Sequence, residues 1–509
     1  MTQNNTLLSF LFKRVDIASL IFFRIAFGIV MLWEVKRYFD KGWIARYWID
    51  PLFNFAYTGF EWLSPWSGNG MYLHFYGLGL LALFISLGLF YRLSMALFFV
   101  AFSYIFLLEE ARYLNHFYLI MLLSFVMIFV PAHRSFSLDA LLRPGLRADT
   151  VPAWTLWLVR FQLGVAYFFG GIAKLNSDWL LRGEPLRDWL SDRTDFPFIG
   201  QFFDYEWAVY LFAYGGLLID LLAVPLLLWR RTRPYAFTAV VLFNLLNASW
   251  FSIGIFPWLM IVASSILFAP SWPRKLFDTL WLRPSHKSVL MMAGALLGTV
   301  GALWFHRTFE LVPLTVGALA GLLISWFFMD KARPLSESSQ FEISYKYSKN
   351  ITRSQFAVVI LLSSWALVQI GLPLRHYTVP SKVSWTEEGH RFAWHMKLRD
   401  KDGEVQFYAV NPHTQDSREI DPRATLTSWQ YRKMSTRPYM IRQFARYLAS
   451  KPENLEAEIR VRALAELNDR EPQFLIDPNV DLAKVDTKLL GRNDWILDLN
   501  ETQYASLEP

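Results

Sequence analysis

Long apolar stretches recur along most of the chain and are separated by short polar segments. Runs of roughly 17 to 25 apolar residues can cross a bilayer as helices. Eleven such runs lie at about 16–35, 72–91, 93–109, 116–132, 153–174, 207–229, 234–251, 254–271, 288–305, 310–329 and 355–374. The pattern predicts a polytopic all-α membrane domain over residues 1–374. Pro257 and the turns around the seventh and eighth runs also allow a re-entrant pair there.

From residue 375 the periodicity changes. Apolar and polar residues alternate in GHRFAWHMKLRD (389–400), GEVQFYAVNP (403–412), EAEIRVRALAEL (456–467) and WILDL (495–499). A period of two is typical of antiparallel strands with one solvated face, and Asp402-Gly403 is a turn signal. Residues 428–450 have helical spacing instead. We therefore expect residues 375–509 to form a β-rich α+β extramembrane domain.

The composition agrees with a membrane protein, because 54% of the 509 residues are hydrophobic and only 18% are charged. The net charge of +7 is uneven along the chain. Residues 1–373 contain 30 Lys+Arg and 22 Asp+Glu, whereas residues 374–509 contain 20 and 21. The basic excess lies in the membrane part, where short cytoplasmic loops usually carry it. Nucleic acid is therefore not an expected partner.

The loops between the predicted spans indicate an orientation. With the N-terminus inside, the cytoplasmic segments hold 18 Lys and Arg residues and the opposite loops hold 10. The positive-inside rule therefore favours a cytoplasmic N-terminus. An odd number of spans then places the C-terminal domain on the extracytoplasmic side of a multi-pass cell-membrane protein.

The chain contains no cysteine, which excludes disulfides, zinc–thiolate sites and iron–sulfur ligation. Its nine histidines include no HxxxH or HExxH spacing. His390 and His395 are five residues apart in a predicted strand and would face opposite sides of it. The sequence therefore predicts no metal site.

Several polar residues fall near the predicted outer ends of the spans. Such convergence is common where a site lies between helices, although helix ends also carry polar residues without a function. The residues are His74, Asn115, His116, Lys174, Asn244 and Asn247.

Three charged residues lie deeper in the predicted spans. Arg24 and Asp220 are near the middle of theirs, and Arg160 is about two turns into its helix. Isolated charges at such depth are costly and are usually paired or face water. We predict a structural ion pair of Asp220 with Arg24 or Arg160.

Lys174, in VAYFFGGIAKLNSDWL (165–180), has two interpretations. It can anchor the helix end with its ammonium group in interfacial water. Alternatively, its amine is desolvated beside Gly170 and Gly171, which would let a flat ring approach. A neutral amine is a general base for a phenol-like hydroxyl. Spacing alone does not decide between the two.

The chain resembles the vitamin K-dependent γ-glutamyl carboxylases and their bacterial relatives, the HTTM domain proteins. The resemblance covers nearly the whole chain. It rests on FFRIAFGIVML (22–32), LNHFYLIMLLSFVMIFVPAHRSFSLDALL (114–142), VAYFFGGIAKLNSDWL (165–180), FSIGIFPWLMIVASSILFAPSWPRKL (251–276), WTEEGHRFAWHMKLRD (385–400) and LNDREPQFLIDPNVDL (467–482).

The resemblance implies a membrane enzyme, a carbon–carbon lyase, that uses reduced vitamin K of the phylloquinol or menaquinol type. O2 and CO2 would be co-substrates, and no metal is expected. In this family a lysine takes a proton from the hydroquinone, and oxygenation toward the epoxide generates a stronger base. That base removes a γ-proton from a glutamate, which then takes up CO2. The expected partners are a glutamate-containing protein or peptide and membrane lipids.

The resemblance also implies which residues form the site. The family's base lysine falls on Lys174, and Ala173 replaces the first of two adjacent lysines of the animal members. His116 is the second catalytic candidate, and Asn244 stands where a histidine is expected in the seventh span. The candidates for hydroquinone binding are Asn115, His116, Asn244 and Asn247.

The glutamate site departs further from the animal pattern. Gly389-His390-Arg391 precedes Trp394 where animal members have Leu-Tyr-Gly, so His390, Arg391 and Trp394 are the substrate-binding candidates. The two runs at 288–329 are not expected in the animal enzymes either. Two alternatives remain open: a hydroquinone epoxidase without carboxylase activity, and a non-catalytic quinone- or lipid-binding membrane module.

Overall fold

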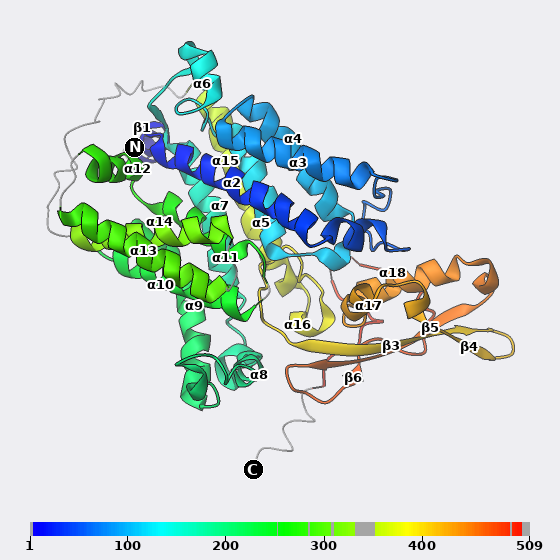
Figure 1. The fold of residues 1–509 in the computed structure, drawn as a ribbon. Helices are drawn as coiled ribbons and strands as arrows, with labels where there is room; N and C mark the ends of the chain where they lie inside the picture. The colour runs from blue at the N-terminus through cyan, green and yellow to red at the C-terminus, as the bar shows by residue number, and fades with distance from the viewer. Residues whose placement is uncertain are drawn as a thin grey trace.

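The computed structural model describes residues 4–251, 253–282, 286–306, 310–330, 352–488 and 491–500. A large helical part precedes a smaller part that contains a sheet (Figure 1). The helices of the first part are α1 (Asn4–Phe12), α2 (Ala18–Asp40), α3 (Gly70–Leu87), α4 (Tyr91–Leu107), α5 (Asn115–Phe129), α6 (Leu138–Leu142), α7 (Ala153–Ile172), α8 (Leu186–Ser191), α9 (Glu206–Leu228), α10 (Arg233–Trp250), α11 (Phe256–Ser264), α12 (Trp272–Phe277), α13 (His286–His306), α14 (Leu311–Asp330) and α15 (Arg353–Leu374). Two short strands, β1 (Arg14–Asp16) and β2 (Thr150–Pro152), pair antiparallel beside them.

A helix overlaps most of each of the eleven apolar ranges, as expected where the backbone must satisfy its own hydrogen bonds in lipid. Among the described residues, six helices are long and apolar enough to cross a membrane, namely α2, α3, α7, α9, α14 and α15. A further candidate is the pair Phe256–Leu267 and Trp272–Leu280, which is bent by 98°. The helical part is therefore that of a membrane protein. The count of eleven spans, the N-in orientation and the division at residue 374 stay predictions.

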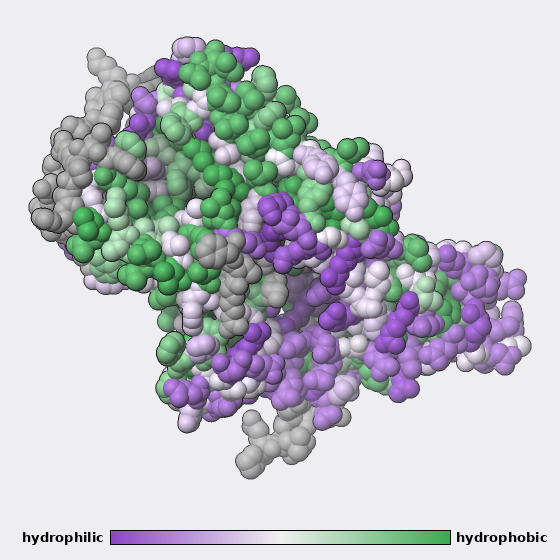
Figure 2. Space-filling model, viewed as in Figure 1, coloured by the Kyte–Doolittle hydropathy of each residue, from purple (hydrophilic) through white to green (hydrophobic). Residues whose placement is uncertain are grey.

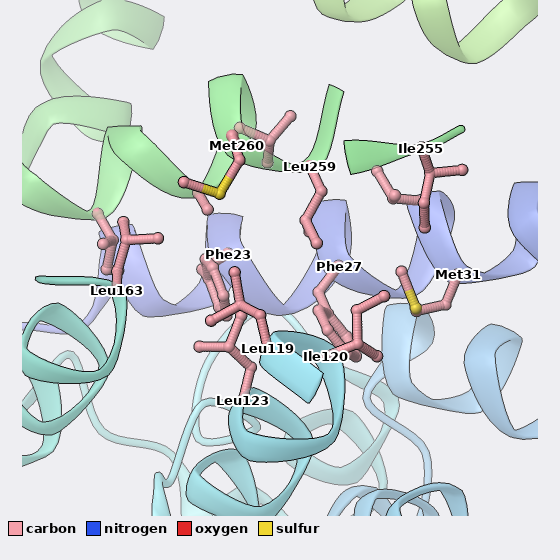
Figure 3. Close-up of a cluster of buried hydrophobic side chains, with 14 of the residues drawn as sticks. Phe23, Phe27, Met31, Leu119, Ile120, Leu123, Leu163, Ile255, Leu259 and Met260 are labelled. Atoms are coloured by element: carbon pink, nitrogen blue, oxygen red, sulfur yellow. The ribbon is translucent and has the colours of Figure 1, made fainter. Parts of the chain in front are cut away.

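The centre of the bundle is formed by α2 and α7. In their most apolar windows 67% and 72% of the residues are buried, against 11% in α15. Phe23, Phe27 and Met31 repeat every four residues, so they share one face of α2. Figure 3 shows this face packed between α5 and α11, where Leu119 and Leu259 contribute. On the face that Figure 2 shows, the surface of the helical part is largely hydrophobic, whereas that of the C-terminal part is largely hydrophilic.

The C-terminal part is a four-stranded antiparallel sheet with three helices. The strand order is β4–β3–β5–β6. Alternate residues of β5 are buried, and α18 packs on that face, where the rings of Phe444 and Phe407 are 5.2 Å apart. The elements are α16 (Val383–Thr386), β3 (Lys401–Val410), β4 (Ser417–Ile420), α17 (Ser428–Met434), α18 (Pro438–Ala449), β5 (Glu458–Leu467) and β6 (Gln473–Phe474).

The predicted strands at 403–412 and 456–467 and the helical segment at 428–450 are confirmed, but the turn at 402–403 is wrong. Asp402 and Gly403 lie inside β3, opposite Glu466 and Ala465. A Cβ at Gly403 would lie 2.6 Å from the carbonyl oxygen of Ser435. The glycine therefore allows a close backbone contact within a strand and does not mark a turn.

Two other predicted strands are not formed. Residues 389–400 form turns and bends, because Phe392, Trp394 and Lys397 have φ between 54° and 64° and cannot be extended. In WILDL, Ile496 makes an isolated bridge to Ile476. In the first segment, residues 393–395 are buried in succession, so the alternation of apolar and polar residues does not correspond to a pleated strand.

Candidate functional site

One cavity of about 980 Å³ lies where α5, α7, α9 and α10 meet residues 387–400. It brings together most of the polar residues singled out in the sequence, from segments nearly 280 positions apart. Those that line it are Asn115, His116, Lys174, Asp220, Asn244, Asn247, His390, Arg391 and Trp394. His74 lies elsewhere, with its Nε2 atom 3.0 Å from the carbonyl oxygen of Ala101. Arg24 and Arg160 do not line the cavity.

Lys174 follows the C-terminal end of α7, and its side chain is only 6% exposed. Its Nζ atom donates to Asp220 Oδ2 at 2.5 Å and to the carbonyl oxygen of Gly170 at 3.2 Å. It also lies 5.3 Å from the ring centroid of Trp179. The amine is therefore withdrawn from bulk water, which does not match the interpretation of an interfacial anchor.

The predicted ion pair of Asp220 with Arg24 or Arg160 is wrong. Arg24 donates to the carbonyl oxygens of Ala132 and Phe136 at 3.2 and 2.6 Å. Arg160 donates to those of Ile266 and Phe268 at 2.9 and 2.6 Å. Except for that of Phe136, which lies in the loop before α6, these carbonyls lie at or just after helix ends, where they lack intrahelical partners and carry partial negative charge. Hydropathy gives the depth of a charge but not which way its side chain points.

Gly170 and Gly171 also differ from their predicted role, because neither lines the cavity. A Cβ at Gly171 would lie 2.6 Å from Leu221 Cδ2, and one at Gly170 would lie 2.8 Å from Met396 Cε. The two glycines therefore let α7 approach α9 and the loop above it. Gly216 of α9 does line the cavity, close to Lys174.

Asn115 and His116 open α5 on the opposite wall of the cavity. The Asn115 side chain accepts from Tyr113 Oη at 3.0 Å and donates to the carbonyl oxygen of His395 at 3.0 Å. His116 packs against Phe256, with 5.7 Å between ring centroids. Neither ring nitrogen of His116 has a hydrogen-bond partner in the described part of the chain. Asn115 thus positions the loop above, and the nitrogens of His116 are left at the wall of the cavity.

Two asparagines of α10 line the same cavity one turn apart. Asn244 is 2% exposed, and its amide nitrogen donates to the carbonyl oxygen of Val240 at 2.8 Å. This bond within the helix fixes the amide and turns its oxygen away from that carbonyl. Asn247 lies further toward the end of α10. Both therefore add polar atoms to an otherwise apolar wall.

Residues 387–400 close the cavity in a strained conformation. Glu387, Phe392, Trp394 and Lys397 all have positive φ, and each such residue costs about 1–3 kcal/mol. The strain is held by contacts with the helical part: the backbone nitrogen of Phe392 donates to Tyr113 Oη at 2.8 Å. Strain supported in this way is common at functional sites.

The sequence predicted that His390 and His395 face opposite sides of a strand. This prediction is wrong, because the segment is not a strand. The ring centroids of the two histidines are 5.3 Å apart. Burial lowers the pKa of His395 to about 3 and that of His390 well below its ordinary value of 6.5, so both imidazoles are neutral at physiological pH. Within the part of the chain that the structure describes, the Nε2 atom of His395 and the Nε1 atom of Trp394 are buried without a hydrogen-bond partner. His395 was missed because its strand assignment pointed it away from the site.

Three arginines line the part of the cavity next to the sheet. Arg391 forms an ion pair with Glu110, and Arg399 forms one with Glu387. Arg437 has no carboxylate within 4 Å among the described residues. Burial lowers the pKa of Arg437 to about 10, so it keeps its charge at neutral pH. No spacing in the sequence connects Arg437 with the other site residues, and it was missed for that reason.

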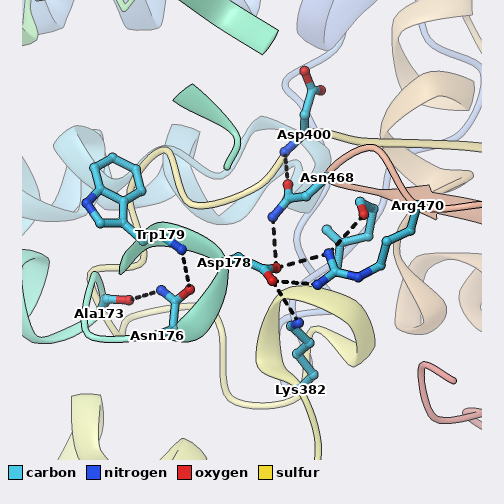
Figure 4. Close-up of polar contacts among 9 residues, drawn as sticks. Ala173, Asn176, Asp178, Trp179, Lys382, Asp400, Asn468 and Arg470 are labelled. Carbon is cyan, nitrogen blue, oxygen red and sulfur yellow. Dashed lines mark hydrogen bonds and ion pairs between the residues drawn. The ribbon is translucent and has the colours of Figure 1, made fainter. Parts of the chain in front are cut away.

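A polar network attaches the C-terminal part immediately after Lys174 (Figure 4). Asp178 is 2% exposed and accepts from Arg470 at 2.5 and 3.1 Å. Lys382 and Asn468 donate to the same carboxylate at 3.1 and 3.0 Å. Asp178 is therefore not the interfacial end of a helix but a buried junction between the two parts.

No group of three or more His, Asp or Glu side chains that could hold a metal ion occurs within the residues that the structure describes. The charged and polar side chains of the cavity are instead arranged as pairs and single donors. Such a site can bind and deprotonate an organic ligand and hold an anion beside it.

Two family models match the chain. The model of the HTTM domain matches residues 12–272, about half of the chain. The model of the vitamin K-dependent gamma-carboxylase lumenal domain matches residues 354–502. Neither match includes α13 or α14, and no solved structure matches the chain. Because the two matches carry the cavity-lining helices and residues 387–400, this chain belongs to the vitamin K-dependent gamma-carboxylase family of HTTM domain proteins.

Proposed function

We propose that the chain is a vitamin K-dependent gamma-glutamyl carboxylase-like enzyme that couples oxygenation of the hydroquinone to carboxylation of glutamate. Hydroquinone, O2, CO2 and a glutamate side chain would give the epoxide, water and γ-carboxyglutamate. The observation that carries the proposal is the buried Lys174–Asp220 pair in a cavity that Asn115 and His116 also line. The family matches support the carboxylase-like class of reaction.

The cavity fits a flat aromatic ligand with polar edges. His116 and Trp179 supply ring faces, and the unpartnered nitrogens of Trp394 and His395 require a polar ligand atom or water. When bound, reduced vitamin K supplies the oxidisable ring whose reaction with O2 drives removal of the glutamate proton. Lys174 accepts a hydroxyl proton of that ligand. His116 binds the ligand oxygen or polarises the charge that develops on it. Asn244 and Asn247 would bind at its other edge.

The glutamate side chain would lie toward the sheet, beside His390, Arg391 and Trp394. Because Arg391 already pairs with Glu110, Arg437 is the better candidate to neutralise the incoming carboxylate. The surplus positive charge of this wall suits an acidic peptide. The same Arg391–Glu110 pair is what favours the second candidate function, an epoxidase whose carboxylate site is closed.

The proposed site lies on the extracytoplasmic side of a multi-pass cell-membrane protein. The excess of Lys and Arg in the predicted cytoplasmic loops supports this orientation. The name of the lumenal domain that matches residues 354–502 agrees with it. The expected partners are a glutamate-containing protein or peptide and the surrounding lipids.

One incubation tests the proposal. The purified full chain would be given reduced vitamin K, O2, labelled CO2 and a glutamate peptide, and epoxide and incorporated label would be measured separately. Formation of both products supports the carboxylase, and formation of the epoxide alone supports the epoxidase. If neither product forms, both enzyme functions are contradicted and the binding module remains.

The base assignment has its own variant. Lys174→Ala should lower the rate of epoxide formation by about 10²–10⁴-fold, the contribution of a positioned general base. The matched control is Lys484→Ala, which removes a lysine that is 77% exposed in the C-terminal part. Undiminished epoxide formation by folded Lys174→Ala would show that another group takes the proton.

A further inference from the structure

Lys174 has a buried carboxylate next to it, and this changes which group can take a proton. Both side chains are almost fully buried, at 6% and 7% exposure, and their charged atoms are 2.5 Å apart. In a medium of low dielectric constant, a lysine and an aspartate at this distance hold one proton between them and carry no net charge. While Lys174 is an ammonium group in this pair, it can accept a proton only if it gives one of its own to another group.

The carboxylate itself still has an open side. Asp220 Oδ2 accepts from Lys174, and no hydrogen-bond partner of Oδ1 is present among the described residues. Asp220 lines the cavity, as Lys174 does. The other titratable groups that face the pair are Tyr167 of α7 and His395 of the loop above. Both border the pair without forming an ion pair with it.

We propose that Lys174 and Asp220 act as one proton relay in which Asp220 is the final acceptor. Lys174 takes the proton of a ligand hydroxyl while one of its own ammonium protons moves to Asp220. The ligand O–H bond breaks with its electron pair left on oxygen, and an O–H bond forms on the carboxylate. Lys174 remains an ammonium group and pairs with the new negative charge. The site has no net charge before and after the transfer, which suits a buried cavity.

This inference rests on the proposed function only for the identity of the ligand. Asp220 would be a positioning residue for Lys174 and the end point of the proton, and not a structural charge. The chemistry requires only an acidic hydroxyl of a flat ligand in the cavity. Tests can therefore be made on the protein with and without turnover.

The first test is chemical labelling of Lys174, which needs no substrate. A small amine-acylating reagent reacts with neutral amines, and mass spectrometry would give the labelling rate of each lysine across pH. In Asp220→Asn the ammonium loses its counter-ion, so labelling of Lys174 at pH 7.5 should increase at least tenfold. Lys397, which also lines the cavity and does not contact Asp220, is the internal reference. An unchanged Lys174 rate would overturn the pairing.

The second test is turnover by the same variant. Asp220→Asn should lower kcat for epoxide formation at least tenfold and leave KM for the hydroquinone within about threefold. Asp220→Glu keeps a carboxylate and should recover part of kcat; it also tests the relay if the asparagine variant does not fold. Wild-type kcat in Asp220→Asn would make Asp220 a structural counter-ion. A wild-type protein without epoxide formation contradicts the proposed function instead, while the labelling result still decides the pairing.

Discussion

At the scale of single residues, the position of Asp220 depends on how closely α7 approaches α9. Gly171 faces Leu221, the residue after Asp220, and an added Cβ would lie 2.6 Å from Leu221 Cδ2 and 3.2 Å from its backbone nitrogen. Because a backbone atom is involved, α9 itself would have to shift. We expect Gly171→Ala to lower the free energy of unfolding by about 1–3 kcal/mol, as overpacking does.

The neighbouring glycine provides the control for this prediction. A Cβ at Gly170 would meet the terminal methyl group of Met396, which can rotate away. Gly170→Ala should therefore stay close to the wild type in thermal midpoint, measured in detergent by intrinsic tryptophan fluorescence. Equal losses in the two alanine variants would contradict the view that Gly171 sets the helix spacing.

The sequence predicted the position of several site residues but not their partners. Asn115 and Lys174 were found because hydropathy places both at the predicted outer ends of their spans. Asp220 was recognised as a charge that must be compensated, yet its partner was assigned wrongly because hydropathy does not give the direction in which a side chain points. Arg437 could not be found at all, since only the docking of α18 brings it to the cavity.

At the scale of elements, α13 and α14 form a hairpin that lies outside both family matches and does not line the cavity. The two helices meet through glycines, and a Cβ at Gly321 would lie 1.9 Å from the carbonyl oxygen of Gly294. Gly321→Ala must therefore separate the helices. We expect a lower thermal midpoint, with KM for the hydroquinone unchanged.

Gly301 of the same hairpin is a matched control, because a Cβ placed there would meet no described atom within 4 Å apart from the backbone of its own helix and its chain neighbours. Gly301→Ala should keep the wild-type midpoint or raise it slightly, since alanine favours the helix by about 1 kcal/mol. A change of hydroquinone KM in folded Gly321→Ala would show that the hairpin shapes the site.

Element types were predicted where one periodicity dominates a long segment. The apolar runs each contain a helix, and β5 follows the alternation of EAEIRVRALAEL. The same alternation in GHRFAWHMKLRD was misleading. That segment lies over the cavity, where the backbone nitrogen of Phe392 donates to Tyr113 Oη and the carbonyl oxygen of His395 accepts from Asn115. Local periodicity cannot distinguish such a loop from a strand.

At the scale of the whole molecule, two polar junctions hold the C-terminal part against the helices. Glu109 accepts from Gln430 of α17 at 3.0 Å, and Glu110 accepts from Gln443 of α18 at 3.1 Å. The second junction is Asp178. Residues 387–400 lie between the two junctions and carry His390, Arg391 and Trp394. The roof of the cavity is thus held partly by contacts that lie outside it, which a sequence pattern does not reveal.

The Asp178 junction gives a prediction for the stability of the whole assembly. Asp178→Asn leaves Arg470 and Lys382 without their buried counter-ion, and breaking a buried pair in this way costs about 3–5 kcal/mol. We expect a lower thermal midpoint at pH 7 and faster proteolysis between the two parts. Asp494→Asn is the control, since that side chain is 85% exposed and should leave both measurements unchanged.

The pH dependence of this difference identifies its cause. Burial alone would raise the pKa of Asp178, but the hydrogen bonds and charges of Arg470 and Lys382 lower it below its ordinary value of 3.8. The carboxylate therefore stabilises the folded state fully above about pH 4, and this contribution is lost as pH falls through the folded pKa. The difference between wild type and Asp178→Asn should be constant from pH 8 to 5 and shrink below pH 4. A difference that does not decrease at all as pH falls below 4 would indicate that packing, and not the charge of Asp178, joins the two parts.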